Sequence, residues 1–351
     1  MKIESVKEVA QVLFRAFKIS VVCVLALAFV STSCKKDDEE EDELLRLEGA
    51  PNFDLPIYAL PGDTIKLYAY GVNTKGAYYS WAFGGLDTLY ESDDLKTVWL
   101  QAPDSLGVYE VMLTADCGDE YYSASLSQFI SVIGDSSLTG MIPSPMVFVD
   151  PRDDNEYGIV EIGNLQWFNR DLNWKGAGKG YGSTEAAAKI LGRLYTWNDA
   201  TGGESSSGLG NGVQGVCPPG WSIPTNEDWI DLAMALNGGV EVSFMDNWKG
   251  IAPDLMAIAV FNGSAAWKYS PAVTPTNAYG WNALGTGCAQ SGYNHYSNML
   301  SYGFWWSSTQ MDSQKAHYRY IYSEYPDLSV DYCSKDGMGA SVRCVRLKEN
   351  N

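Results

Sequence analysis

"GVCPPGWSIPTNEDWIDLAMAL", residues 215–236, ends in the pattern of an amphipathic helix. Thr225 precedes Asp228 by three residues, the spacing of a capping box, in which each side chain accepts a hydrogen bond from the other residue's backbone N–H. The apolar residues that recur on one helical face are Trp229, Leu232, Ala233 and Leu236. The stretch therefore predicts a helix that begins after Thr225, packs by its apolar face and ends at Gly238.

Two shorter patterns precede this helix. "YGIVEIGNLQWF", residues 157–168, places Gly163 and Asn164 between two apolar runs, which predicts a hairpin with these two residues at its turn. "STEAAAKILGRLY", residues 183–195, predicts a second, shorter helix. The C-terminal half therefore mixes helices with antiparallel strands.

The same half carries five landmarks in one order, of which the helix stretch is the third. The other four are "FVDPRDDNEYGIVEIGNLQWFNRDLNW" (148–174), "GRLYTWNDA" (192–200), "YGFWWSSTQ" (302–310) and "GASVRCVRL" (339–347). Together they resemble the Fibrobacter succinogenes major paralogous domain over residues 146–348, a family related in pattern to C-type-lectin-like and formylglycine-generating-enzyme-like folds. The resemblance implies an α+β domain with twisted antiparallel strands, few helices and long ordered loops.

The cysteines fit an exported protein with disulfides. Cys217 and Cys344 stand at the two landmarks most like the family, so we expect them to form a bridge that closes a loop of about 127 residues. On the chain-entropy model such a bridge adds roughly 4–5 kcal/mol. Cys288 is paired with Cys333 by elimination, although sequence alone does not fix connectivity, and Cys117 is the expected spare thiol.

Residues 48–134 alternate apolar and polar residues in short runs, which predicts an all-β sandwich. "YYSWAFGG" (78–85) followed by "DSLGVYEVMLTA" (104–115) resembles the polycystic-kidney-disease (PKD) type of Ig-like domain. The resemblance implies a spacer or protein-binding unit. The expected architecture is thus multidomain, an Ig-like sandwich followed by a C-type-lectin-like α+β domain.

Residues 1–33 have the layout of a secretory signal peptide, and the resemblance described next implies the lipoprotein type. Basic residues precede "ISVVCVLALAFV" (19–30), and "STSC" ends at Cys34, which resembles a bacterial lipobox and implies lipidation of that cysteine. The segment 34–47, with "KKDDEEEDE" after Cys34, predicts a solvated acidic tether. It also resembles the export signal of Bacteroidetes-type surface lipoproteins, which implies an outer-membrane anchor facing the cell exterior. An ordinary signal peptide and a merely solubilising spacer are the alternatives.

Three further patterns remain open. "GDSSLTGMIPSP", ending at residue 145, predicts a linker over 135–145. Adjacent strand residues point to opposite faces, so one of Trp305 and Trp306 could lie outside the core as a candidate ligand platform; a core strand is the alternative and the favoured interpretation. A solvated turn, or else a set of oxygen ligands for calcium, is expected at Asp150, Asp153, Asp154 and Glu156.

Net charge and the motifs in the sequence limit the classes of function that we expect. A formal charge of -19 disfavours nucleic acid and anionic membrane surfaces as partners. No catalytic motif is present, so we expect no enzyme and no cofactor other than calcium. The sequence favours a non-catalytic surface lipoprotein that binds extracellular glycan or protein; a structural or fimbria-associated adhesion component and an enzyme of unrecognised class are the alternatives.

Overall fold

The computed structural model describes residues 43–349. Backbone contacts divide the chain into two units, Met1–Glu43 and Leu44–Asn351, and every element below belongs to the second. The predicted signal peptide, Cys34 and the start of the acidic tether lie outside the described residues. Among the described residues, no helix combines the length and the apolar character that crossing a bilayer requires.

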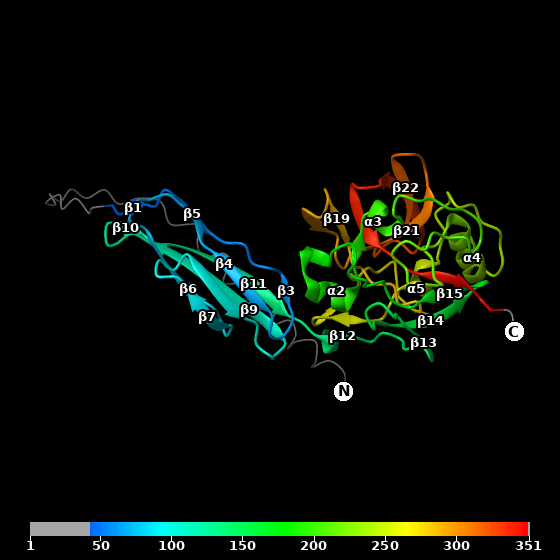
Figure 1. The fold of residues 1–351 in the computed structure, drawn as a ribbon, viewed down its shortest axis with the longest axis horizontal. Helices are drawn as coiled ribbons and strands as arrows, with labels where there is room; N and C mark the ends of the chain where they lie inside the picture. Colours follow the sequence, from blue (N-terminus) through cyan, green and yellow to red (C-terminus); the bar gives the residue numbers. More distant parts are fainter. Residues whose placement is uncertain (1–42, 350–351) are drawn as a thin grey trace, which may run out of the picture. The chain divides into compact units, whose positions relative to one another are not determined.

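The N-terminal part of this unit consists of short strands in four sheets (Figure 1). One sheet has the order β3-β11-β9-β6, another β4-β8-β7, and the small sheets are β2-β5 and β1-β10. The strands are β1 (Leu45–Arg46), β2 (Gly49–Asn52), β3 (Tyr58–Ala59), β4 (Thr64–Tyr68), β5 (Tyr70–Val72), β6 (Tyr78–Ala82), β7 (Asp87–Glu91), β8 (Thr97–Gln101), β9 (Gly107–Asp116), β10 (Tyr121–Tyr122) and β11 (Ala124–Val132).

The longer strands β4, β8 and β9 alternate buried with more exposed residues, as the alternating sequence predicts, whereas β7 is exposed throughout. Ile65 and Leu67 of β4 share one apolar core with Val111 and Leu113 of β9, while the residues between them are exposed or half-buried. The first strand starts inside the segment predicted as tether, because Leu45 pairs with Tyr121. The ordered β structure therefore begins before residue 48.

The C-terminal part contains all the described strands and helices that follow β11. Its sheets have the orders β12-β17-β18, β13-β14-β15-β25 and β20-β19-β24-β21-β22-β23, with β16 paired to β24. The strands are β12 (Leu138–Thr139), β13 (Met146–Val149), β14 (Glu156–Ile162), β15 (Leu165–Phe168), β16 (Leu194–Tyr195), β17 (Val260–Phe261), β18 (Ser264–Ala265), β19 (Cys288–Gln290), β20 (His295–Ser297), β21 (Tyr302–Gln310), β22 (Lys315–Tyr322), β23 (Leu328–Ser334), β24 (Met338–Ser341) and β25 (Val345–Leu347).

Helices in this part are few and short. The α-helices are α2 (Glu185–Leu191), α3 (Trp197–Thr201), α4 (Asn226–Leu236) and α5 (Ala252–Leu255), and the 3-10 turns are η1 (Asp135–Ser137) and η2 (Tyr181–Ser183). The predicted second helix is confirmed as α2, and Thr184 caps it by accepting a hydrogen bond from Ala187. The described unit is thus mostly β-sheet.

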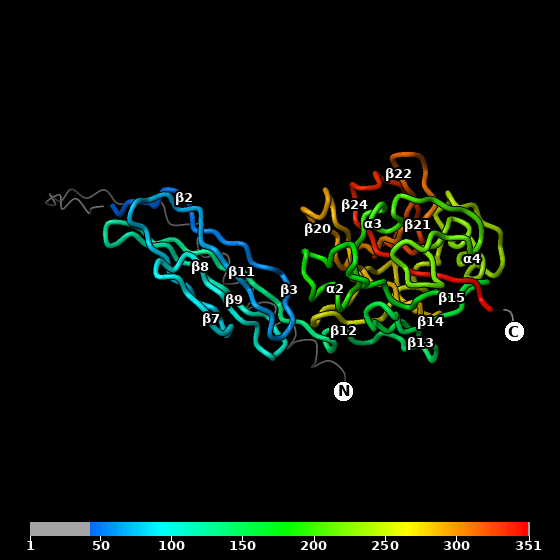
Figure 2. The backbone as a smooth tube through the Cα atoms, viewed as in Figure 1, coloured from blue at the N-terminus to red at the C-terminus, as the bar shows by residue number. Residues whose placement is uncertain are grey.

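The predicted hairpin is confirmed. Ile162 pairs with Leu165, which leaves Gly163 and Asn164 as the two-residue turn, and Gly163 has a φ of 62°. Asn164 donates from its backbone and side chain to Asp231 of α4, at 2.7 and 2.6 Å, so the turn is fastened to the helix beside it (Figure 1). β15 also pairs with β25, which brings the end of the domain beside the β14–β15 hairpin (Figure 2).

The capping box of α4 is also confirmed. The Thr225 hydroxyl accepts from the Asp228 amide at 3.1 Å, and the Asp228 carboxylate accepts from the Thr225 amide at 2.9 Å. Asp228 accepts a further bond from the Gly210 amide at 2.7 Å. Gly238 follows the C-cap residue with a φ of 65°, the left-handed conformation that glycine tolerates best.

Asp228 should make stability pH-dependent. Burial raises its pKa from 3.8 to about 6 against the opposing effect of its backbone hydrogen bonds. Between pH 4 and 6 the folded chain then holds this proton more tightly than the unfolded chain, so this contribution to the free energy of unfolding falls as pH rises, by at most about 1.4 kcal/mol per pH unit. Urea unfolding of the wild type and Asp228→Asn measures the difference. A wild-type-minus-variant difference that rises with pH in this window would contradict the assignment.

The segment 135–145, predicted as a linker, is instead part of the C-terminal fold. Leu138 and Thr139 form β12, which pairs with β17 through Phe261 and Val260. The prediction failed because the pairing partner lies more than a hundred residues away, whereas the local Gly, Ser and Pro content resembles that of a connector. This segment consequently lines a cavity.

Candidate functional site

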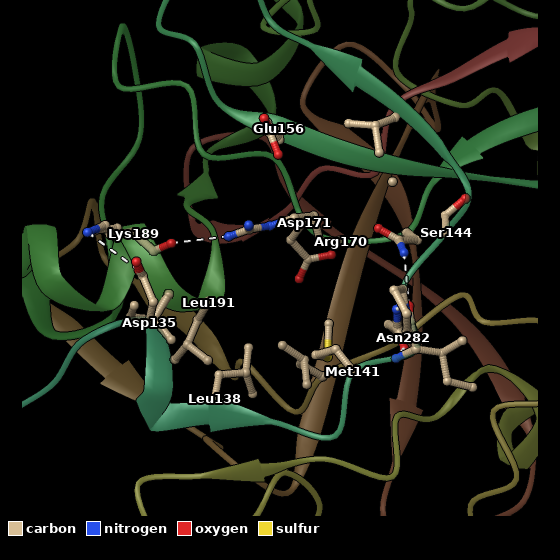
Figure 3. Close-up of a pocket in the computed structure, with 17 residues that line it drawn as sticks. Asp135, Leu138, Met141, Ser144, Glu156, Arg170, Asp171, Lys189, Leu191 and Asn282 are labelled. Carbon is tan, nitrogen blue, oxygen red and sulfur yellow. Dashed lines mark hydrogen bonds and ion pairs between the residues drawn. The ribbon is translucent and has the colours of Figure 1, made fainter.

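A cavity of about 450 Å³ opens in the C-terminal part of the chain (Figure 3). Its volume is within the range of roughly 300–1,000 Å³ typical of small-molecule sites. Its walls come from β12 and the residues after it, from β14, from the segment after β15 and from the end of α2. The lining side chains include Leu138, Met141, Glu156, Arg170, Asp171 and Leu191.

Asp171 reaches the cavity because β15 continues as an extended segment along the C-terminal residues. Phe168 donates from its amide to the Cys344 carbonyl at 3.0 Å, and Leu172 donates to the Val342 carbonyl at 2.9 Å. These two bonds set Asp171 beside Arg343, which lies 172 residues later in the sequence. Both side chains are 0% exposed.

All donors to Asp171 converge on one of its oxygens. Oδ1 accepts from Arg343 Nε at 2.9 Å, lies 2.8 Å from Arg343 Nη2 and accepts from Trp305 Nε1 at 2.8 Å. Oδ2 is buried and has no hydrogen-bond partner among the described residues. An unpaired buried polar atom costs about 1–3 kcal/mol. In Figure 3 the Asp171 carboxylate points towards the cavity, so this oxygen is a ready acceptor for a ligand donor.

Arg343 fixes the carboxylate and compensates its charge. Its guanidinium carbon lies 3.8 Å from the centre of the Trp281 ring, and Nη1 donates to the carbonyls of Phe168, at 3.4 Å, and of Trp281. Complete burial lowers the pKa of Arg343, and the neighbouring Asp171 carboxylate partly opposes this effect. The buried pair therefore presents an oriented acceptor with little net charge.

The other walls differ in character. Leu138, Met141 and Leu191 supply apolar surface at one side of the cavity (Figure 3). Arg170 is half-buried, and its Nη2 donates to the Lys189 carbonyl at 3.1 Å. The exposed carboxylate of Glu156 lies at the opposite wall. The arrangement combines an acceptor, a cationic donor and an apolar side, which suits recognition of a small amphipathic group.

The tryptophan pair singled out from the sequence lies elsewhere. Trp305 and Trp306 are both 0% exposed, so the core-strand interpretation is confirmed and the alternative that one lies outside the core is wrong. They point to opposite faces of β21, as adjacent strand residues must, but each face is covered by its own apolar cluster. Neither ring can therefore serve as a ligand platform, although the Trp305 indole helps to hold Asp171.

The acids proposed as calcium ligands are not gathered by the structure. Asp150 is buried and accepts from Arg152 Nε and Nη2 at 2.9 and 2.6 Å, and Asp153 accepts from the Asn155 amide. Within residues 43–349, no group of three or more His, Cys, Asp or Glu residues is arranged to hold a metal ion. Arg152 thus already binds the Asp150 carboxylate, which a calcium ion would need as a ligand. Calcium binding by this chain stays an untested prediction.

The cysteines follow the prediction in part. Cys217 and Cys344 form the expected disulfide, with a Cα–Cα distance of 5.9 Å. The expected bond between Cys288 and Cys333 is not formed, since both are free thiols, as is Cys117. Three strands separate β19 from β23 in the sheet, and burial raises the pKa of the Cys333 thiol to about 12, which disfavours the thiolate that disulfide formation requires.

Sequence patterns singled out one residue of the cavity, Glu156, and did so as a candidate calcium ligand; they missed the others. Asp171 and Arg343 belong to quoted landmarks, but only the folded chain brings them together. Leu138 and Met141 were assigned to the linker. A signal was present in the apolar residues Leu138, Met141 and Ile142, which are unusual in an exposed connector.

The chain is thus a β-rich protein with a cavity built on a buried ion pair. Residues 160–346 match the model of the Fibrobacter succinogenes major domain, which is more than half of the chain. The chain belongs to this family. The match includes Arg170, Asp171, Leu191 and Arg343, whereas Leu138, Met141 and Glu156 precede it. No curated protein matches the chain.

Proposed function

We propose that this protein is a non-catalytic binding protein whose C-terminal domain takes an extracellular glycan into the cavity at Asp171. The observation that carries the proposal is the buried, unpaired Oδ2 of Asp171 in the cavity wall. Sugars present several O–H and N–H donors together with C–H faces, so they match an acceptor set beside apolar side chains. The overall charge of -19 favours a neutral ligand over an anionic one.

The proposed cellular setting is the outer face of the outer membrane. The support is the order of signal peptide, Cys34 and acidic tether in residues 1–47. Lipidation at Cys34 would anchor the chain through buried methylene groups. An anchored domain of this kind meets glycans of the surroundings or of neighbouring cells.

The two parts of the described unit have proposed roles within this scheme. Sheets that share one apolar core support a PKD-type, Ig-like spacer for the N-terminal strands. The mixture of antiparallel sheets, short helices and long loops supports a C-type-lectin-like fold for the C-terminal part. In this scheme the spacer presents the cavity domain.

A glycan array and a pulldown with the full chain test the proposal, each with calcium and with chelator. We expect saturable binding to one class of neutral glycan. Chelator should leave it unchanged, because the cavity's acceptor is held by the Arg343 guanidinium rather than by a metal ion. Self-association or a protein partner without any glycan binding would overturn the proposal in favour of an adhesion component. Conversion of a bound glycan would overturn its non-catalytic character.

A further inference from the structure

We propose that the cavity recognises the acetamido group of an N-acetylated sugar. This inference rests on the proposed glycan binding and names its ligand class. A secondary acetamide joins an N–H donor, a carbonyl acceptor and a methyl group within one small, neutral unit. The cavity offers one partner for each of these three features.

The N–H donor matches Asp171. Oδ1 is already occupied by Arg343 and Trp305, so a ligand can add a hydrogen bond only at Oδ2. A carboxylate oxygen accepts and does not donate, so the ligand must supply the hydrogen. An anionic ligand would face this oxygen without a compensating proton.

The carbonyl matches Arg170. This residue directly precedes Asp171, and its guanidinium donates one hydrogen bond, from Nη2 to the Lys189 carbonyl. The remaining N–H groups of a guanidinium, which carries five in all, are available to a ligand acceptor. In Figure 3 the side chains of Arg170 and Asp171 lie next to one another at the cavity. The amide nitrogen and the carbonyl oxygen of the ligand, which share one carbon, therefore meet complementary groups.

The methyl group matches the apolar side formed by Leu138, Met141 and Leu191. A hydroxyl in place of the acetamido group would supply a donor for Asp171 but would bury no methyl group. An ammonium group would supply donors too, yet it would lose its hydration beside Arg170 and the apolar wall. Charge balance at Asp171 agrees, because the cationic Arg343 compensates this carboxylate.

The test compares three ligands that differ at one carbon. Calorimetric titration of the full chain would use the methyl glycoside of N-acetylglucosamine, methyl glucoside, and the methyl glycoside of glucosamine. One net hydrogen bond and one buried methyl group predict that the acetamido sugar binds roughly 10- to 30-fold more tightly than the glucoside. Equal affinity for the first two ligands, or tighter binding of the ammonium sugar, would overturn the inference.

Variants locate the binding. Arg170→Gln removes the guanidinium that would bind the carbonyl of the ligand's acetamido group, at a half-buried position. We expect this variant to bind the acetamido sugar about 5- to 10-fold more weakly. Its affinity for methyl glucoside should change less than twofold. The matched control is Arg46→Gln, at an exposed arginine of β1 that does not line the cavity. Asp171→Asn should abolish the preference for the acetamido sugar; circular dichroism would verify that this variant folds.

The outcomes separate this inference from the proposed function. If no glycan binds in the array, the proposed function fails and this inference fails with it. If glycans bind without a preference for the acetamido group, or Arg170→Gln and Arg46→Gln behave alike, only this inference fails. Tighter binding of a peptide carrying N-acetyl-lysine than of the sugar would also overturn it, because the recognised acetamide would then belong to a protein.

Discussion

Replacing Arg343 with methionine should lower the free energy of unfolding by about 3–5 kcal/mol, because the change leaves a buried carboxylate without its counter-ion. The Asp171 side chain is completely buried, and within residues 43–349 its one donor besides Arg343 is the Trp305 indole. The substitution also removes the donors to the Phe168 and Trp281 carbonyls. Chemical denaturation monitored by tryptophan fluorescence measures the loss.

A double variant gives the matched control. In Asp171→Leu with Arg343→Met, neither charge remains, and replacing a buried ion pair by apolar side chains is often neutral or stabilising. We expect the double variant to recover at least half of the loss seen in Arg343→Met. A single variant that loses less than about 1 kcal/mol would contradict the role given to the pair.

Replacing Cys217 and Cys344 together with serine should cost about 4–5 kcal/mol on the chain-entropy model, since the bridge joins residues 127 positions apart. Reducing agent should lower the unfolding midpoint of the wild type towards that of the double variant and leave the variant itself unchanged. Cys117→Ser is the matched control, because that cysteine is a half-exposed free thiol. A wild type that is insensitive to reductant under unfolding conditions would contradict a stabilising bridge.

Local features of the fold could be predicted from the sequence. The α4 capping box and the Gly163–Asn164 turn depend on residues a few positions apart, so their patterns are complete within a short window. The Cys217–Cys344 bridge could be predicted for another reason, because both cysteines stand at landmarks of the family.

Features that depend on residues far apart in the chain could not be predicted from the sequence in this way. β12 resembled a linker because its partner β17 is distant in the chain. Trp306 was a candidate platform because a strand pattern does not tell whether its second face is covered, and here an apolar cluster covers it. The cavity depends on Asp171 meeting Arg343, and no spacing rule links two residues 172 positions apart.

A crystal structure of the chain soaked with the methyl glycoside of N-acetylglucosamine would test sugar binding at Asp171 most directly. We expect the sugar in the cavity, with its amide nitrogen within hydrogen-bond distance of Asp171 Oδ2 and its methyl group against Leu138 and Met141. Sugar bound elsewhere on the chain while the cavity holds only solvent would contradict it.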